Sequence, residues 1–154
     1  MKSNLFTLAL LLAVAPVLAQ SSEEASIKAV LVGHTQAGLD DDAESAVGYF
    51  ADSPYAAISY QQPGSGYIRG HEAVKAKYRE VMNRDGANNK SPDKLTTGEY
   101  LYRVVGNTAF VTSIEIKTKP DGTAERTHKA NYLEKEAGQW KMIGNFWMPE
   151  MKAK

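Results

Sequence analysis

The sequence predicts an α+β fold in which helices come first and an antiparallel sheet follows. Apolar residues recur at helical spacing in the first half of the chain, whereas from Leu95 onward they alternate every second residue. Short glycine-containing turns divide this second half into four strand-like segments, as expected for strands that pair with their chain neighbours. Because one face of such a sheet must be covered and only the helices can cover it, the two halves are expected to pack together.

The first residues have the layout of a secretory signal peptide. Lys2 precedes an apolar run over 5–14, and small residues at 17–19 stand before a cleavage point at Gln20. We therefore expect residues 1–19 to be removed and residues 20–154 to form one periplasmic or secreted domain, with no membrane insertion after the signal is removed. The competing interpretation is a buried N-terminal helix.

Composition excludes several classes of function. The chain carries 18 basic and 18 acidic residues, so no excess of positive charge favours nucleic-acid binding. It has no cysteine, which excludes disulfides, thiol nucleophiles and sulfur-ligated zinc. Its three histidines have no Asp or Glu spaced to complete a metal site, and the acidic triplet at 40–42 is typical of a helix start rather than of a cation-binding loop. We expect neither a metal nor a cofactor.

Three helices are predicted before the sheet. Ser21 and Glu24 form a capping-box pattern that opens a helix reaching to about Ala37. The acidic triplet starts a short second helix that ends before Pro54, and Gly70 leads into a third helix over 71–82. The predicted strands comprise a short pair after the second helix (55–61 and 67–70) and a four-strand meander (95–105, 108–119, 124–136 and 139–148).

The order of these elements, with "YFAD", "RGHEAV" and "YLEKEAGQWKMIGNFW" at their places in it, resembles the nuclear transport factor 2-like superfamily. Within that superfamily the chain is most similar to SnoaL-like and ketosteroid-isomerase-like domains, over all of residues 20–154. The resemblance implies a cone-shaped fold, with three N-terminal helices packed on a curved antiparallel sheet around a pocket open at one end. Such domains include isomerases, cyclases and epoxide hydrolases as well as binding and assembly domains, so the fold alone does not decide the function.

His34 is the most informative residue of the first helix. It continues the apolar stripe of Ile27, Val30 and Leu31, where an aliphatic side chain is expected. It also stands eight residues before Asp42, at the position where the resemblance implies a polar side chain that points into the pocket. The imidazole is therefore either a core histidine or a polar group facing a cavity. In both cases burial predicts that it is neutral at pH 7.

The catalytic carboxylates of the resembled enzymes have no counterpart at the matching positions. The position of the isomerase general base falls on Ile58, and that of the second oxyanion donor falls on Ala130. The epoxide-hydrolase positions fall on Ile114, Ile116 and Asn145. An asparagine can hold a water molecule but cannot deprotonate it. The residues at these positions therefore argue against both reactions.

A pocket can nevertheless be assembled by adding the residues that alternation places on the same strand faces. The expected ligand-binding residues are His34, Ile58, Tyr60, Ile114, Ile116, His128, Tyr132, Asn145 and Trp147. Glu115, Lys117 and the charges at 134–136 are expected to point outward. Such an apolar pocket with a few polar groups predicts a protein that binds a small apolar or amphipathic molecule.

The alternative is an isomerase or cyclase-type enzyme that uses His34 or His128 as acid and base. We also expect a homodimer that forms through the outer face of the sheet, because an exposed meander of this size usually needs cover.

Overall fold

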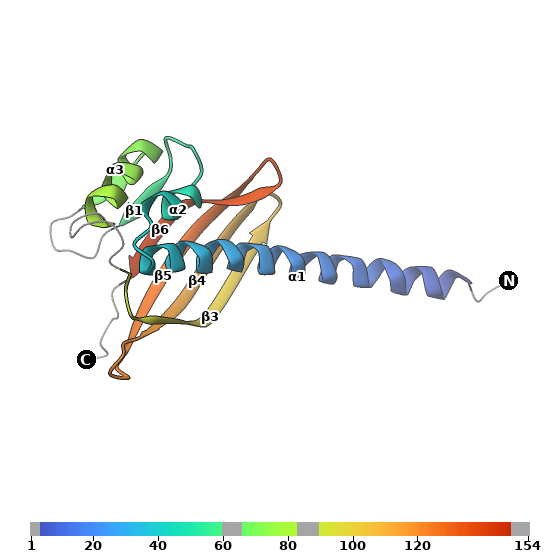
Figure 1. Ribbon diagram of the computed structural model, residues 1–154. Coiled ribbons are helices and arrows are strands. Elements are labelled where there is room, and N and C mark those ends of the chain that lie inside the picture. Colours follow the sequence, from blue (N-terminus) through green and yellow to red (C-terminus); the bar gives the residue numbers. More distant parts are fainter. Residues whose placement is uncertain (1–3, 60–65, 83–89, 149–154) are drawn as a thin grey trace, which may run out of the picture.

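The computed structural model describes residues 4–59, 66–82 and 90–148 (Figure 1). Its helices are α1 (Asn4–Leu39), α2 (Ala43–Gly48) and α3 (His71–Met82). Two short strands, β1 (Ala57–Ser59) and β2 (Tyr67–Arg69), lie between α2 and α3 in the chain. Four long strands follow: β3 (Lys94–Val105), β4 (Thr108–Thr118), β5 (Ala124–Glu136) and β6 (Gln139–Met148). This is the α+β arrangement that the sequence predicts.

The strands form one six-stranded sheet in the order β2-β1-β6-β5-β4-β3. Every neighbouring pair is antiparallel except β1 and β6, which run parallel. The meander therefore follows chain order, while the short β1 joins the sheet beside the last strand. This pairing places Ile58 next to Asn145.

Helix α1 crosses one face of the sheet, and its N-terminal part extends beyond the sheet edge (Figure 1). Its inward residues Ile27 and Leu31 are almost fully buried and belong to the same apolar core as Val111, Leu133 and Met142 from the strands. The helix predicted to begin at Ser21 begins at Asn4, because the segment before Ser21 is rich in leucine and alanine and also favours a helix. In the described part of the chain, no helix has the length and apolarity needed to cross a membrane.

Asp42 caps the short helix α2, as expected for the acidic triplet. Its side chain accepts a hydrogen bond from the backbone N–H of Ser45 at 3.0 Å, and this bond and a second one from the Ser45 hydroxyl keep the pKa of Asp42 low. Helix α2 packs between α1 and α3, and α3 contacts β1 and β2. Helices α2 and α3 therefore lie together near β1, whereas α1 runs across the face of the sheet (Figure 1).

Two register shifts interrupt the strand ladders. In β3 the shift lies between Thr97 and Tyr100, where a Cβ on Gly98 would collide with the carbonyl oxygen of Ile114. In β6 the consecutive partners of Tyr132 and Leu133 are Gly144 and Met142, so Ile143 is an extra residue, as in a β-bulge.

The shift in β6 changes which residues face α1. Before it, Trp140 and Met142 are buried on that side, and after it Asn145 and Trp147 face the same side.

Candidate functional site

A cavity of about 300 Å³ lies where α1, α3 and the sheet meet. Its walls come from α1, α3 and four strands. The lining residues are His34, Thr35, Gly38, Leu39, Ile58, Ser59, Tyr78, Met82, Glu115, Lys117, Thr127, Lys129, Asn145 and Trp147. The structure thus brings together four residues that the sequence analysis assigned to a pocket: His34, Ile58, Asn145 and Trp147.

The expectation that Ile114 and Ile116 face the pocket is wrong. On β4 the buried residues are the odd-numbered ones from Ala109 to Glu115, so both isoleucines lie on the opposite face of the sheet. Strand side chains alternate, and an assignment that is off by one residue therefore inverts every side chain. Lys117 and Glu115, which were expected to point outward, line the cavity instead.

The same inversion applies to β5. Its buried residues include Thr127 and Lys129, whereas the predicted pocket residues His128 and Tyr132 lie on the outer face. Lys135, also expected to point outward, forms an ion pair with Glu23 of α1 at 2.6 Å. The ninth predicted residue, Tyr60, lies outside the described residues.

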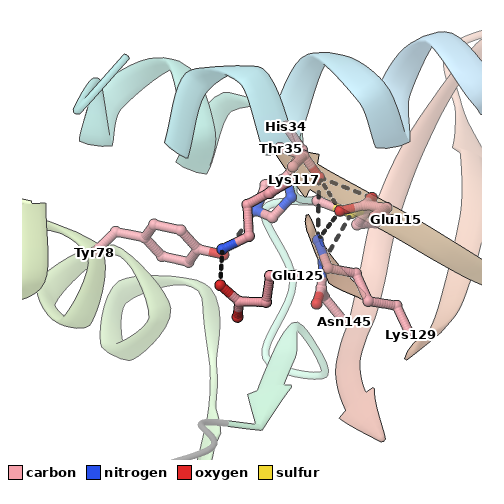
Figure 2. Close-up of polar contacts among 9 residues, drawn as sticks. His34, Thr35, Tyr78, Glu115, Lys117, Glu125, Lys129 and Asn145 are labelled. Atoms are coloured by element: carbon pink, nitrogen blue, oxygen red, sulfur yellow. Dashed lines mark hydrogen bonds and ion pairs between the residues drawn. The ribbon is translucent and has the colours of Figure 1, made fainter. Parts of the chain in front are cut away.

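Three residues form what we call the polar cluster of the cavity: Thr35, Glu115 and Lys129 (Figure 2). Lys129 Nζ lies 2.6 Å from Glu115 Oε2, and the two side chains are only 5% and 4% exposed. The Thr35 hydroxyl donates to the Glu115 carboxylate at 2.9 Å and accepts from Lys129 Nζ at 3.1 Å. The cluster joins α1 to β4 and β5 through groups that are all hydrogen-bonded, which is the condition under which buried charges are tolerated.

The environment of Lys129 acts on its charge in two directions. Burial lowers the pKa of its ammonium group, the Glu115 carboxylate raises it, and the nearby Lys117 lowers it again, with a net lowering. Nζ also lies 5.2 Å from the centre of the Trp147 ring, within the range of a cation–π contact.

His34 lies in the cavity wall above α3. Its side chain is 7% exposed, and its Nε2 is 2.7 Å from the hydroxyl of Tyr78 (Figure 2). Burial lowers the pKa of His34 to about 3, and the positive charge of Lys129 contributes in the same direction. The imidazole is therefore neutral at pH 7, as the sequence predicted, and it forms a polar but uncharged part of the wall.

Packing against α2 fixes the rotation of α1 that aims His34 at the cavity. The Tyr49 ring lies so close to Gly33 that a Cβ at that position would collide with the tyrosine hydroxyl. The rings of Tyr49 and Phe50 both meet the imidazole edge to face, with centroids 6.5 and 5.5 Å away. A glycine next to the histidine is thus part of what positions it.

The far wall is formed where β1 meets β6. Ile58 pairs with Asn145, and the Ser59 hydroxyl accepts a hydrogen bond of 3.0 Å from the backbone N–H of Trp147. Together with Leu39 and Met82, Ile58 and Trp147 form the apolar part of the lining, and the Trp147 ring borders the polar cluster through Lys129.

Each lysine in the lining has a carboxylate partner. Lys129 pairs with Glu115 inside the cavity, and Lys117, at the more exposed rim, lies 3.8 Å from Glu125 (Figure 2). His34 is neutral. The cavity therefore offers paired charges and neutral hydrogen-bonding groups to a ligand.

Further hydrogen-bonding capacity lies next to the polar cluster on the inward face of the sheet. Ser113 is the cross-strand partner of both Tyr100 and Lys129, and Asn131 is the partner of Asn145. Within the described part of the chain, the side-chain polar atoms of Ser113, Asn131 and Tyr100 are buried without a hydrogen-bond partner. Burial also raises the pKa of Tyr100. The sheet under α1 is thus more polar than an ordinary core.

Sequence reasoning missed Thr35, Tyr78, Glu115 and Lys129. A signal for the two charged residues exists: Glu115 shares its strand face with Ala109 and Val111, and Lys129 shares its face with Leu133. Thr35 stands four residues after Leu31, at the edge of the apolar stripe of α1.

No metal site is evident in the described segments. They contain no cluster of three or more histidine, aspartate or glutamate side chains arranged to hold an ion. His34 lines the cavity, whereas His128 lies on the outer face of the sheet, so the sheet separates the two imidazoles.

No protein-family model and no curated protein sequence matches the chain. Solved structures do match. They include a variant of a protein of unknown function from Mycobacterium tuberculosis (TM-score 0.67, 21% identity, 86% of this chain and 75% of that chain). A second is an NTF2-like protein of unknown function from Pseudomonas putida, with a TM-score of 0.67 and 16% identity over 86% of this chain and 89% of that chain. A third is the association domain of C. elegans CaMKII, with a TM-score of 0.67 and 14% identity over 85% of this chain and 98% of that chain. The chain therefore has a nuclear transport factor 2-like fold.

Proposed function

We propose that this chain is an exported protein that binds a small amphipathic molecule in the cavity between α1, α3 and the sheet. The observation that carries the proposal is a buried polar cluster in the wall of a cavity whose lining also contains apolar side chains. Thr35, Glu115 and Lys129 offer both donors and acceptors, while Ile58 and Trp147 offer carbon surface. This combination of apolar walls with a few fixed polar groups is typical of small-molecule sites.

The size of the cavity limits the ligand. A volume of about 300 Å³ lies at the lower end of the range for ligand pockets, so a molecule of one or two rings is favoured over a large lipid. The neutral His34 and Tyr78 can exchange one hydrogen bond with such a molecule without introducing a charge.

Benzyl alcohol is a suitable probe, because it has one apolar ring and one hydroxyl. We expect titration of isotope-labelled protein to shift the backbone amide signals of Ile58, Lys129 and Trp147 in a saturable way. Gly38→Leu is expected to weaken binding about tenfold, since a Cβ at Gly38 points toward Met82 in the cavity wall. Gly48→Leu is the matched control, because a Cβ there meets no atom within 4 Å.

Two results count against the proposal. One is the absence of saturable shifts at the cavity residues. The other is equal loss of binding in the two glycine variants, which places the probe elsewhere. Mass spectrometry of molecules extracted from protein purified from its own source then identifies the natural ligand class.

The alternative is an enzyme of the isomerase or cyclase type. The specific observation in its favour is Glu115, a carboxylate inside the cavity that sequence reasoning had pointed outward. Both oxygens of this carboxylate are already engaged, by the Thr35 hydroxyl at 2.9 Å and by Lys129 Nζ at 2.6 Å, so a substrate would have to displace one of these groups to reach it. His34 is also a poor base, since its pKa is lowered to about 3. Reversible binding is therefore the better-supported function.

We further propose export and self-association. Export is inferred from the signal-peptide layout of residues 1–19. Self-association is inferred from the outer face of the sheet, where Leu101 is 73% exposed and Phe110 is 47% exposed. The likeness to an association domain supports the same idea.

Light scattering tests self-association directly. A homodimer is expected for the natural chain, and Phe110→Glu is expected to give a monomer because it places a charge in the apolar face. Tyr55→Glu, at an aromatic residue that is 74% exposed and lies outside the strands, is the matched control. A monomeric natural chain at micromolar concentration contradicts this part of the proposal.

A further inference from the structure

Lys129 is unusual among the lysines of this chain. In the described segments it is the one lysine that is buried, and its Nζ lies in the wall of the cavity rather than in solvent. The other inward-facing lysine of β5, Lys135, is 23% exposed and lies away from the cavity, beside Glu23. Transfer of an ammonium group out of water is costly, so a buried lysine in the wall of a ligand-sized cavity indicates a role beyond packing.

The contacts of Lys129 give its proton a place to go. Glu115 Oε2 is 2.6 Å from Nζ, so transfer of one proton turns a buried ion pair into a neutral amine beside a neutral carboxylic acid. Burial lowers the pKa of Lys129 and the positive charge of Lys117 adds to this effect, and together they outweigh the Glu115 carboxylate, which raises the pKa. Desolvation and a neighbouring cation are the two ways in which proteins activate a lysine as a nucleophile.

We propose that Lys129 forms a covalent imine with the carbonyl carbon of a small aldehyde or ketone held in the cavity. This inference deepens the proposed function and rests on it, because it names the chemical class of the ligand. The geometry that points to it is the placement of Nζ, the Glu115 carboxylate and the Thr35 hydroxyl within hydrogen-bond distance of one another on a cavity wall.

The reaction balances with the groups present. Glu115 takes a proton from the Lys129 ammonium group, and the free amine attacks the carbonyl carbon to form a carbon–nitrogen bond. A proton moves from this nitrogen to the former carbonyl oxygen, a step for which the Thr35 hydroxyl is positioned beside Nζ. Glu115 then returns its proton as that oxygen leaves as water. The product is a protonated imine beside the ionised carboxylate, so the total charge is unchanged.

The cavity suits both ends of such a ligand. The protonated imine occupies the place of the ammonium group and keeps the pairing with Glu115, so no buried charge is left alone. The carbon skeleton of the ligand lies against Trp147 and Ile58. A carbonyl compound therefore satisfies the polar and the apolar walls together.

Reductive trapping tests the proposal on the full chain. The protein is incubated at pH 7 with a limiting amount of benzaldehyde and sodium cyanoborohydride, which converts an imine into a stable benzylamine. Peptide mapping by mass spectrometry then locates the benzyl groups. We expect Lys129 to be modified about tenfold faster than any exposed lysine. Lys129→Met is expected to remove this fast modification, whereas Lys135→Met, its matched control on the same strand, retains it.

Uniform modification of the surface lysines, with Lys129 no faster than the rest, overturns the proposal. This comparison of modification rates uses the natural chain alone, so it decides the question even if Lys129→Met does not fold. The benzyl alcohol titration separates the two levels of inference. Saturable binding of the alcohol without fast trapping at Lys129 refutes the imine and leaves the binding function standing, whereas absence of both refutes both.

Discussion

Replacing Lys129 by methionine tests how strongly the polar cluster holds α1 to the sheet. The substitution keeps the length of the side chain but removes the cation that lies 2.6 Å from Glu115. The carboxylate is then left in a site where it is 4% exposed, and among the described residues the Thr35 hydroxyl is its remaining side-chain donor. Breaking a buried pair in this way costs about 3–5 kcal/mol of folding free energy. For a domain of this size, the melting temperature is expected to fall by roughly 10–15 °C.

Urea unfolding followed by circular dichroism measures this loss. The double variant Glu115→Leu with Lys129→Met removes both charges. It is expected to recover most of the stability, since an apolar pair of similar volume is often as stable as a buried ion pair.

Lys135→Met is the control for this experiment. Its ion pair with Glu23 has the same length, 2.6 Å, but its partners are 23% and 32% exposed, so a loss of about 1 kcal/mol or less is expected. Equal losses in the two methionine variants contradict the reasoning. So does a double variant whose loss equals the sum of the single losses, because that result means the two charges do not depend on each other.

Three further predictions follow from other parts of the chain. Burial lowers the pKa of His34 to about 3 in the folded protein, whereas the ordinary value is about 6.5. Between these two pH values the unfolded chain binds more protons than the folded one. The contribution of His34 to the free energy of unfolding, up to about 5 kcal/mol, is therefore expected to disappear as the pH falls from 6.5 to 3. Urea midpoints of the natural chain should fall more steeply over that range than those of His34→Phe, and equal slopes contradict this. Gly33→Val is expected to destabilise the fold and displace the Tyr49 ring. Thermal melts measure the loss of stability, and near-ultraviolet circular dichroism detects the movement of the ring. An unchanged spectrum and an unchanged melting temperature contradict the close packing of Tyr49 against Gly33. N-terminal sequencing of the exported protein is expected to start at Gln20, and recovery of an intact Met1 contradicts the signal peptide.

The fold was predictable because its sequence signals are local and agree with one another. Turns at Gly106, Gly122 and Gly138 separate segments of alternating apolar residues, and each lies between two of the long strands. The helix over His71–Met82 begins directly after a glycine, as predicted. Each of these signals depends on a few neighbouring residues, so it can be recognised in the sequence without knowledge of the tertiary structure.

The cavity was only partly predictable, because alternation defines two faces of a strand without telling which one is inside. On β4 both faces carry apolar residues: Val111 is buried toward α1, while Ile114 and Ile116 lie on the other side. Hydrophobicity therefore could not exclude the wrong choice. The charges of Glu115 and Lys129 also argued for an outward position, since an isolated charge is rarely buried. Glu115 and Lys129 can be buried because they form an ion pair with each other. Since that pair joins two different strands, neither strand alone reveals it.

The extra residue Ile143 in β6 makes the composition of the cavity independent of chain length at this point of the strand. Met142 and Gly144, on either side of it, already pair with the consecutive residues Leu133 and Tyr132 of β5. Loss of the codon for Ile143 would therefore turn the bulge into a regular ladder and leave Asn145 and Trp147 facing α1. Descendants of this chain can accordingly gain or lose one residue at the bulge without exchanging the side chains that meet a ligand.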